Sequence, residues 1–127
     1  MLEELKKNEY TLLASNGYYS KLDGIKPVIF KMREDINYFK DLIVADKIIG
    51  KASAMLFALS GVKEVYTCVL SISGKQIFEK YNVKYHYEQL VDNIINRLGN
   101  DICPMEKTVK DIDDLNLAYN ALNDKVN

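Results

Sequence analysis

Two lysines and an aspartate lie close together where a segment with helical periodicity begins. Asp46 stands at the expected N-cap, and Lys47 and Lys51 fall four residues apart on the polar strip of the helix. Like charges at this spacing repel and oppose the helix dipole, which costs roughly a few tenths of a kcal/mol. A bound anion near the helix amides would offset that cost, although two solvated lysines give the same pattern.

A second group of polar residues follows the next predicted strand. The SGKQ sequence that begins at Ser73 matches a capping box, Gly74 lies in its first turn, and Ser71 precedes it. Ligands of α/β sheets bind beyond the carboxyl ends of parallel strands, where helix N-termini converge. We therefore expect this group to meet the lysine pair and to form a phosphate or carboxylate site, or else only to cap its own helix.

Asn96 and Arg97 are further candidates for anion binding. They lie near the end of a predicted helix, and the guanidinium and amide groups together would form a bidentate clamp on an anion. The alternative is that Arg97 pairs with a nearby carboxylate such as Asp101.

Cys103 is the one candidate nucleophile among the thiols. It lies before Pro104 at an expected helix start and close in sequence to basic residues, a setting that activates thiols. Its possible acid–base partners are Glu106 and the single histidine, His86, and the sequence arranges neither of them beside it. A packed structural cysteine is the alternative, and Cys68 is expected to be a small buried hydrophobe inside a strand.

Composition excludes several classes of protein. The 127 residues are 48% apolar and 28% charged with a net charge of −1, which is typical of one globular domain, 1–127, without a basic surface for nucleic acid or membrane. No apolar run reaches the roughly 18 residues that a membrane span needs, and the acidic start is unlike a signal peptide. Two cysteines without secretory features predict free thiols in the cytoplasm. The oligomeric state stays open, and a homo-oligomer is compatible with the sequence.

The elements that must position these residues follow from periodicity and turn signals. The central one is Leu42–Ser60, where apolar residues at helical spacing predict a helix capped by Asp46 and ended by Gly61. The other expected helices are Leu2–Lys7, Lys26–Arg33, Ser73–Tyr81, Leu90–Leu98, one beginning at Pro104 and one after Asp114. The expected strands are Tyr10–Ser15, Tyr18–Leu22, Val65–Leu70 and Val83–Tyr87.

The order of these elements predicts an α/β fold. Asn16-Gly17 is a strong hairpin signal between the first two strands. Later in the chain, the expected strand Val65–Leu70, helix Ser73–Tyr81 and strand Val83–Tyr87 follow one another closely. This order and spacing predict a parallel βαβ unit. We expect a three-layer α/β/α arrangement with a mixed sheet of about four strands.

Several sequence strings together resemble one known family. They are VADKIIGKASAMLFALSGVKEVY, an INR followed by a glycine, and CPME followed by a helix ending in DIDD. The chain from Tyr10 to Asp114 resembles the bacterial and archaeal domain-of-unknown-function family 1893. The resemblance implies the cytidine-deaminase-like fold, from which the helix Lys26–Arg33 departs, and it implies no particular activity.

The same resemblance allows a comparison with zinc deaminases. Those enzymes carry His/Cys-x-Glu at the start of the main helix and Pro-Cys-x-x-Cys at the start of the next. The corresponding positions here are expected at Ala45–Lys47 and Leu70–Gly74, and neither stretch contains a histidine, a cysteine or a glutamate. We therefore predict no metal site, no cofactor and no zinc-dependent deamination.

Three functions remain open from the sequence. The first is metal-free binding of a small anionic metabolite or nucleotide at Asp46, Lys47 and Lys51 with the serine group and the Asn96-Arg97 pair. The second is an enzyme that uses Cys103 or Lys47. The third is a structural or regulatory interaction module, which the lack of a complete catalytic constellation favours.

Overall fold

A single mixed sheet of five strands organises the computed structural model, which describes all residues 1–127. The strands are β1 (Leu12–Ala14), β2 (Tyr19–Ser20), β3 (Ile43–Ile49), β4 (Glu64–Ser71) and β5 (Lys84–Val91). The helices are α1 (Leu2–Lys7), α2 (Lys26–Glu34), α3 (Lys51–Ser60), α4 (Ile72–Lys80), α5 (Pro104–Val109) and α6 (Leu115–Lys125). The α/β class is confirmed, with five strands where about four were expected.

The strand order in the sheet is β2-β1-β3-β4-β5. The β1–β2 and β1–β3 pairs are antiparallel, whereas β3–β4 and β4–β5 are parallel. Each parallel pair is joined by a helix, α3 or α4, that crosses back over the sheet as parallel connections require. The predicted hairpin and βαβ unit are both confirmed, and a second such unit, β3-α3-β4, was not predicted.

The extra strand comes from the stretch that was predicted as the start of the main helix. Ile43–Ile49 is strand β3, and α3 begins only at Lys51, so Asp46 is not a helix cap. A short apolar run with β-branched residues fits a buried strand as well as a helix. The sheet decides between them, because β3 pairs with β1 on one side and β4 on the other.

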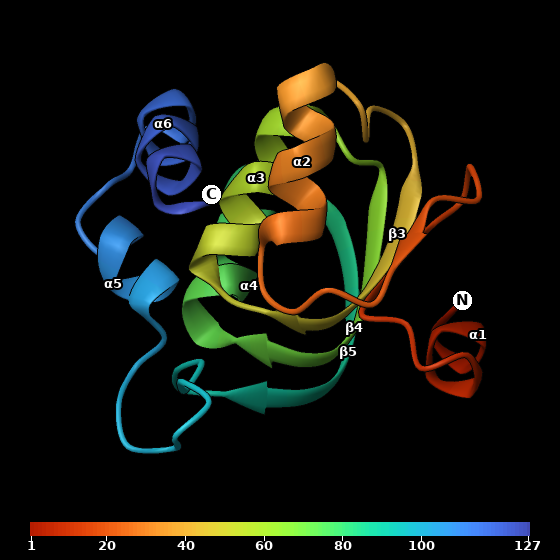
Figure 1. Cartoon of the computed structure of the whole chain (residues 1–127), viewed down its shortest axis with the longest axis horizontal. Helices are drawn as coiled ribbons and strands as arrows, with labels where there is room; N and C mark the ends of the chain where they lie inside the picture. Colours follow the sequence, from red (N-terminus) through yellow and green to blue (C-terminus); the bar gives the residue numbers. More distant parts are fainter.

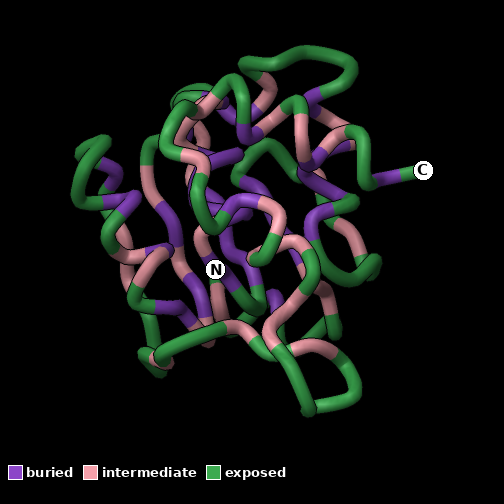
Figure 2. The backbone as a smooth tube through the Cα atoms, turned by 90° about the vertical axis from the view of Figure 1, so that its left-hand side faces the viewer, coloured by how far each residue is buried: buried purple, intermediate pink, exposed green.

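The helices lie on both faces of the sheet (Figure 1). Helix α1 packs against β3 and β4 on one face, where Leu5, Leu13 and Ala45 form a small buried cluster. The other helices lie on the opposite face, where α3 packs against α2, α4 and α6. Figure 2 shows that the buried residues lie in the interior of the molecule, with exposed loops around them.

Two further boundaries differ from prediction. Helix α4 is capped by Ser71, whose side chain accepts a hydrogen bond from the Gly74 amide at 3.0 Å, so the cap is not Ser73. The expected helix Leu90–Leu98 is absent, because Leu90 and Val91 continue β5 in parallel register with β4. The chain from 92 to 103 is a loop that one bridge, Ile95 to Ile102, holds together.

Local signals placed several elements correctly. Pro27 lies in the first turn of α2, and Pro104 begins α5. Gly61 ends α3 in the left-handed conformation, with φ of 85°. Asp114 caps α6 by accepting a hydrogen bond from the Leu117 amide at 2.9 Å. No helix combines the length and the apolar character that crossing a membrane would require.

Candidate functional site

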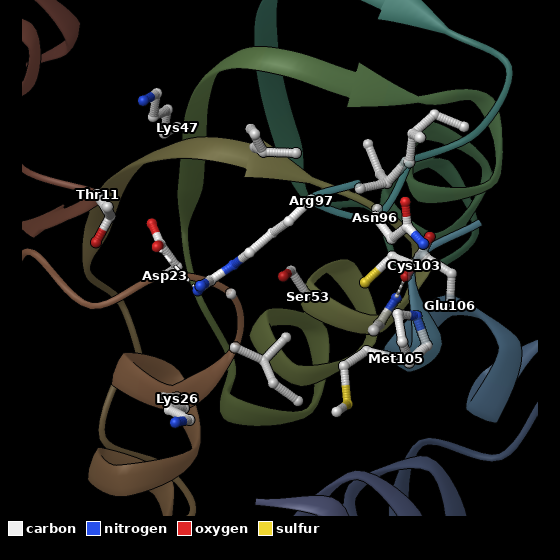
Figure 3. A pocket seen from close by; sticks show the side chains of 18 of the residues that line it. Thr11, Asp23, Lys26, Lys47, Ser53, Asn96, Arg97, Cys103, Met105 and Glu106 are labelled. Carbon is white, nitrogen blue, oxygen red and sulfur yellow. Dashed lines mark hydrogen bonds and ion pairs between the residues drawn. The ribbon is translucent and has the colours of Figure 1, made fainter. Parts of the chain in front are cut away.

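A cavity of about 710 Å³ opens beside the start of α3 (Figure 3). Strand β3 and α3 form its floor, the turn before α2 forms one wall, and the 92–103 loop with α5 forms the other. Its lining is rich in apolar side chains, among them Ile25, Ile48, Ala52, Ile95, Met105 and Val126. Asp46, Lys47 and Ile48 of β3 and the following Gly50 line it, so the cavity lies at the carboxyl end of a parallel strand, where α/β sheets hold ligands.

Asp46 contributes a buried carboxyl group to this cavity. Its residue is only 7% exposed, and burial raises its pKa to about 8 against the weaker opposing effect of the backbone amides of Ile48 and Lys47. A carboxyl group with this pKa is largely protonated at neutral pH. Asp46 can therefore donate a hydrogen bond or a proton to a ligand, whereas a charged helix cap would only accept hydrogen bonds.

The N-terminus of α3 is occupied by a carboxylate from another helix. Glu106 of α5 accepts hydrogen bonds from the backbone amides of Lys51 at 2.7 Å and Ala52 at 2.8 Å. Burial raises the pKa of Glu106, and the two amides act in the opposite direction by favouring its charged form. The first amides of α3 are thus satisfied within the chain and are not left free for the anion that was predicted at the start of the main helix.

An ion pair spans the cavity between its two walls. Arg97 from the loop reaches Asp23 from the turn before α2, with Nη2 and Oδ2 2.9 Å apart (Figure 3). Arg97 therefore pairs with a carboxylate, but the partner is Asp23 and not Asp101, which pairs with Lys107. The Asn96 amide donates to Asn100 within the loop, so it holds the loop's shape beside Arg97.

The structure divides the predicted binding residues between two places. Asp46, Lys47, Asn96 and Arg97 line the cavity. The other residues lie elsewhere: Lys51 and Ser73 line a second depression of about 600 Å³, and Ser71 and Gly74 are buried at the start of α4.

The two helix starts do approach each other, as expected. A Cβ atom placed on Gly74 would lie only 3.0 Å from the Gly50 carbonyl oxygen. The backbones thus pack directly together where a shared hollow was predicted. Glu106 is the only residue that lines both the cavity and the second depression, so its side chain separates the two.

Cys103 also lines the cavity, at the N-cap position of α5 (Figure 3). It is half-buried and free, like Cys68. The only histidine is not its partner, since His86 hydrogen-bonds Glu64 at 2.6 Å and stacks on Tyr66 in the sheet. No acid–base pair is therefore assembled around this thiol.

The observed start of α3 contains none of the residue types that the zinc motif requires. Gly50, Lys51 and Ala52 occupy the start of α3, so moving the helix boundary brings no imidazole or thiolate to it. No three histidine, cysteine, aspartate or glutamate side chains gather as a metal-binding group anywhere in the chain.

Sequence reasoning missed several lining residues. Asp23, Ser53 and Met105 enter the cavity from three separate segments, and Glu106 was predicted as a first-turn acid and a possible partner of Cys103 but not as a cap of α3. No local pattern signals that Glu106 reaches a different helix. Asp23 was missed because an aspartate followed by a glycine is common in turns and does not by itself indicate a binding site.

Comparisons with known proteins agree on one family. The family described as "Domain of unknown function (DUF1893)" matches residues 1–126. A crystal structure of a DUF1893 family protein from Thermotoga maritima is similar to this chain with a TM-score of 0.90 and 26% identity, covering 98% of this chain and 86% of that one. No curated protein matches the chain.

Proposed function

The chain belongs to the DUF1893 family, and from this premise we propose that it binds a small organic anion with an apolar body, such as a nucleotide, in the cavity beside α3. The proposal includes a deaminase-like scaffold on which a binding site remains without zinc. Support for the scaffold comes from the strand order and from the two helix starts beyond the parallel strands. The free cysteines support the expected cytoplasmic location.

The observation that carries the proposal is the cavity with its buried carboxyl group. A volume of about 710 Å³ falls in the range of small-molecule sites, which are lined mainly by apolar side chains with a few polar groups that orient the ligand. Asp46 is such a group, since it is buried and largely protonated. It suits a heterocycle that presents a hydrogen-bond acceptor or an exchangeable proton.

Cations around the cavity favour an anionic ligand. Its lining includes four basic residues: Lys26, Lys47, Arg97 and Lys125. The three acids in the lining are largely committed, because Asp46 is protonated, Glu106 is bound to amides and Asp23 is paired with Arg97. A phosphate or carboxylate at the rim would complement the remaining positive charge.

Thermal shifts with nucleoside monophosphates and their parent nucleosides test this proposal. We expect at least one nucleotide to raise the melting temperature, and Ser53→Leu, which fills the cavity from its floor, to abolish the shift. Lys47→Ala and Lys51→Ala form a matched pair. The first should weaken binding severalfold and the second should not, because only Lys47 lines the cavity. A flat response across the panel, or equal effects of the two lysine variants, would count against this site.

Cys103 favours a second candidate, a thiol enzyme acting on the same ligand, since its side chain belongs to the cavity lining. Rapid alkylation of Cys103 near neutral pH supports that candidate, whereas a thiol that reacts only after denaturation argues against it.

A further inference from the structure

The second depression has a composition unlike that of the cavity. It has a volume of about 600 Å³, and the helices α4 and α5, the start of α3 and the 92–103 loop contribute to it. Of its eleven lining residues, seven carry side-chain hydrogen-bond donors: Lys51, Ser73, Gln76, Lys80, Asn93, Lys107 and Lys110. Only Ile77 and Ile102 are apolar. An acceptor-rich ligand would match this lining, whereas an apolar one would not.

Charge in the depression is unbalanced. Four lysines face two carboxylates in the lining, although the whole chain carries a net charge of −1. Glu106 directs its carboxylate to the α3 amides and forms no ion pair with these lysines, although the charge of Lys51 favours its ionised form. Asp113 is the other acid, and none of the ion pairs in the structure involves it.

The four lysines come from α3, α4 and α5 with its C-cap, and they are partly held in place. Lys51 begins α3 and donates from Nζ to the Lys110 carbonyl oxygen at 3.1 Å, which ties the start of α3 to the end of α5. Lys80 lies at the end of α4, and Lys107 on α5 pairs with Asp101 at the edge of the hollow. Positive charge is therefore gathered by the tertiary fold rather than by a local run of lysines.

We propose that this depression binds a compact polyanion of the inorganic pyrophosphate or oligophosphate class. Such a ligand offers only acceptors, carries several charges and has no apolar surface, which corresponds to the donors and lysines of the lining. The hollow is local, and the balanced net charge provides no extended basic face for a nucleic acid backbone. The proposal stands apart from the function of the larger cavity, because Glu106 separates the two sites.

Calorimetric titration with inorganic pyrophosphate, without divalent metal and at constant ionic strength, tests the site. The variant Lys80→Ala/Lys110→Ala removes two lining charges, yet it keeps the Lys110 carbonyl that Lys51 binds. Its matched control is Lys21→Ala/Lys63→Ala, which removes two charges from exposed positions outside the depression. We expect about tenfold weaker binding in the first variant and less than about twofold in the control.

The outcome separates the two binding proposals. Ser53→Leu should leave pyrophosphate binding unchanged, because Ser53 lines the cavity and not the depression. If the two double variants lost pyrophosphate affinity equally, the binding would reflect general charge attraction. That result would overturn the proposed site. Absence of binding by the unaltered protein at millimolar pyrophosphate would overturn it as well, whatever the nucleotide panel shows.

Discussion

Gly50 lacks a side chain at the point where the carboxyl group of Glu106 lies. A Cβ atom on Gly50 would overlap both carboxyl oxygens and the carbon between them. In that position Glu106 caps α3 by accepting from the amides of Lys51 and Ala52. A helix that has no side-chain cap of its own is thus capped by α5, far along the chain.

Gly50→Ala should destabilise the protein through this collision alone. The backbone at Gly50 is extended, with φ of −108°, so alanine is compatible with it. The added methyl group forces Glu106 off the helix amides, and the free energy of unfolding should fall by about 1–3 kcal/mol. Urea unfolding monitored by circular dichroism measures the loss.

A double-mutant cycle with Glu106→Ala provides the control. Truncation of Glu106 alone should cost about 1–2 kcal/mol, since it removes a helix cap. In that background Gly50→Ala should cost far less, because the group it collides with is gone. Additive losses would show that the two residues do not interact as described.

Asp46 should make stability depend on pH. Its pKa is raised to about 8 in the folded protein and stays near its ordinary value of about 4 when unfolded. The folded state therefore holds the proton longer, and stability falls as pH rises from about 4 to about 8. Between pH 5 and pH 8 the free energy of unfolding of the wild-type protein should fall by on the order of 3 kcal/mol because of Asp46. The Asp46→Asn variant should not show this fall.

Urea unfolding at the two pH values checks this prediction. Asp124→Asn is the control, because that carboxylate is exposed on α6 and its replacement should leave the pH dependence unchanged. If Asp46→Asn kept the full pH dependence of the wild type, Asp46 would not be the buried titrating group.

The Arg97–Asp23 pair should hold the loop rather than the fold. Both side chains are largely exposed, at 83% and 64%, and exposed pairs contribute about 0–1 kcal/mol. Arg97→Ala should leave the unfolding midpoint almost unchanged while it speeds hydrogen exchange at the amides of Asn96 and Cys103, which bond within the loop.

Asp23→Asn should reproduce the exchange pattern of Arg97→Ala, since it removes the other partner of the pair. The amide of Leu117, bonded to Asp114 in α6, serves as an internal reference that neither variant should affect. Unchanged exchange at Asn96 and Cys103 in both variants would mean that the ion pair does not restrain the loop.

Labelling of Cys103 with a bulky maleimide should block the cavity. In a Cys68→Ser background the adduct would occupy the ligand volume, so the nucleotide-induced thermal shift should disappear without unfolding. Cys68 should react slowly in the converse Cys103→Ser variant, because burial raises its pKa. A labelled Cys103 that leaves the ligand response intact would place the ligand elsewhere.

Much of the fold could be predicted because its signals are local. Pro27 and Pro104 fit first helical turns, Gly61 adopts the left-handed conformation that ends a helix, and Asp114 caps the helix that follows it. Each of these residues satisfies or permits backbone groups within one turn of itself. Their effect is therefore readable from a short stretch of sequence.

The misplaced elements depend on partners that lie far away in the chain. Ile43–Ile49 has an apolar pattern that suits either a helix or a strand, and its pairing with β1 and β4 makes it a strand. Leu90 and Val91 likewise extend β5 because β4 offers hydrogen bonds opposite them. Such pairing is not encoded in local periodicity.

The candidate site shows the same division. The sequence by itself determined that Asp46, Lys47, Asn96, Arg97 and Cys103 are polar or reactive residues of an α/β chain, and the structure brings these five into one cavity. Only the tertiary structure decided that Asp46 is buried and largely protonated. It also decided that Glu106 caps the start of α3, where an anion had been predicted to bind. The reason is physical: burial and capping depend on which segments pack together, and that packing arises from contacts between residues distant in sequence.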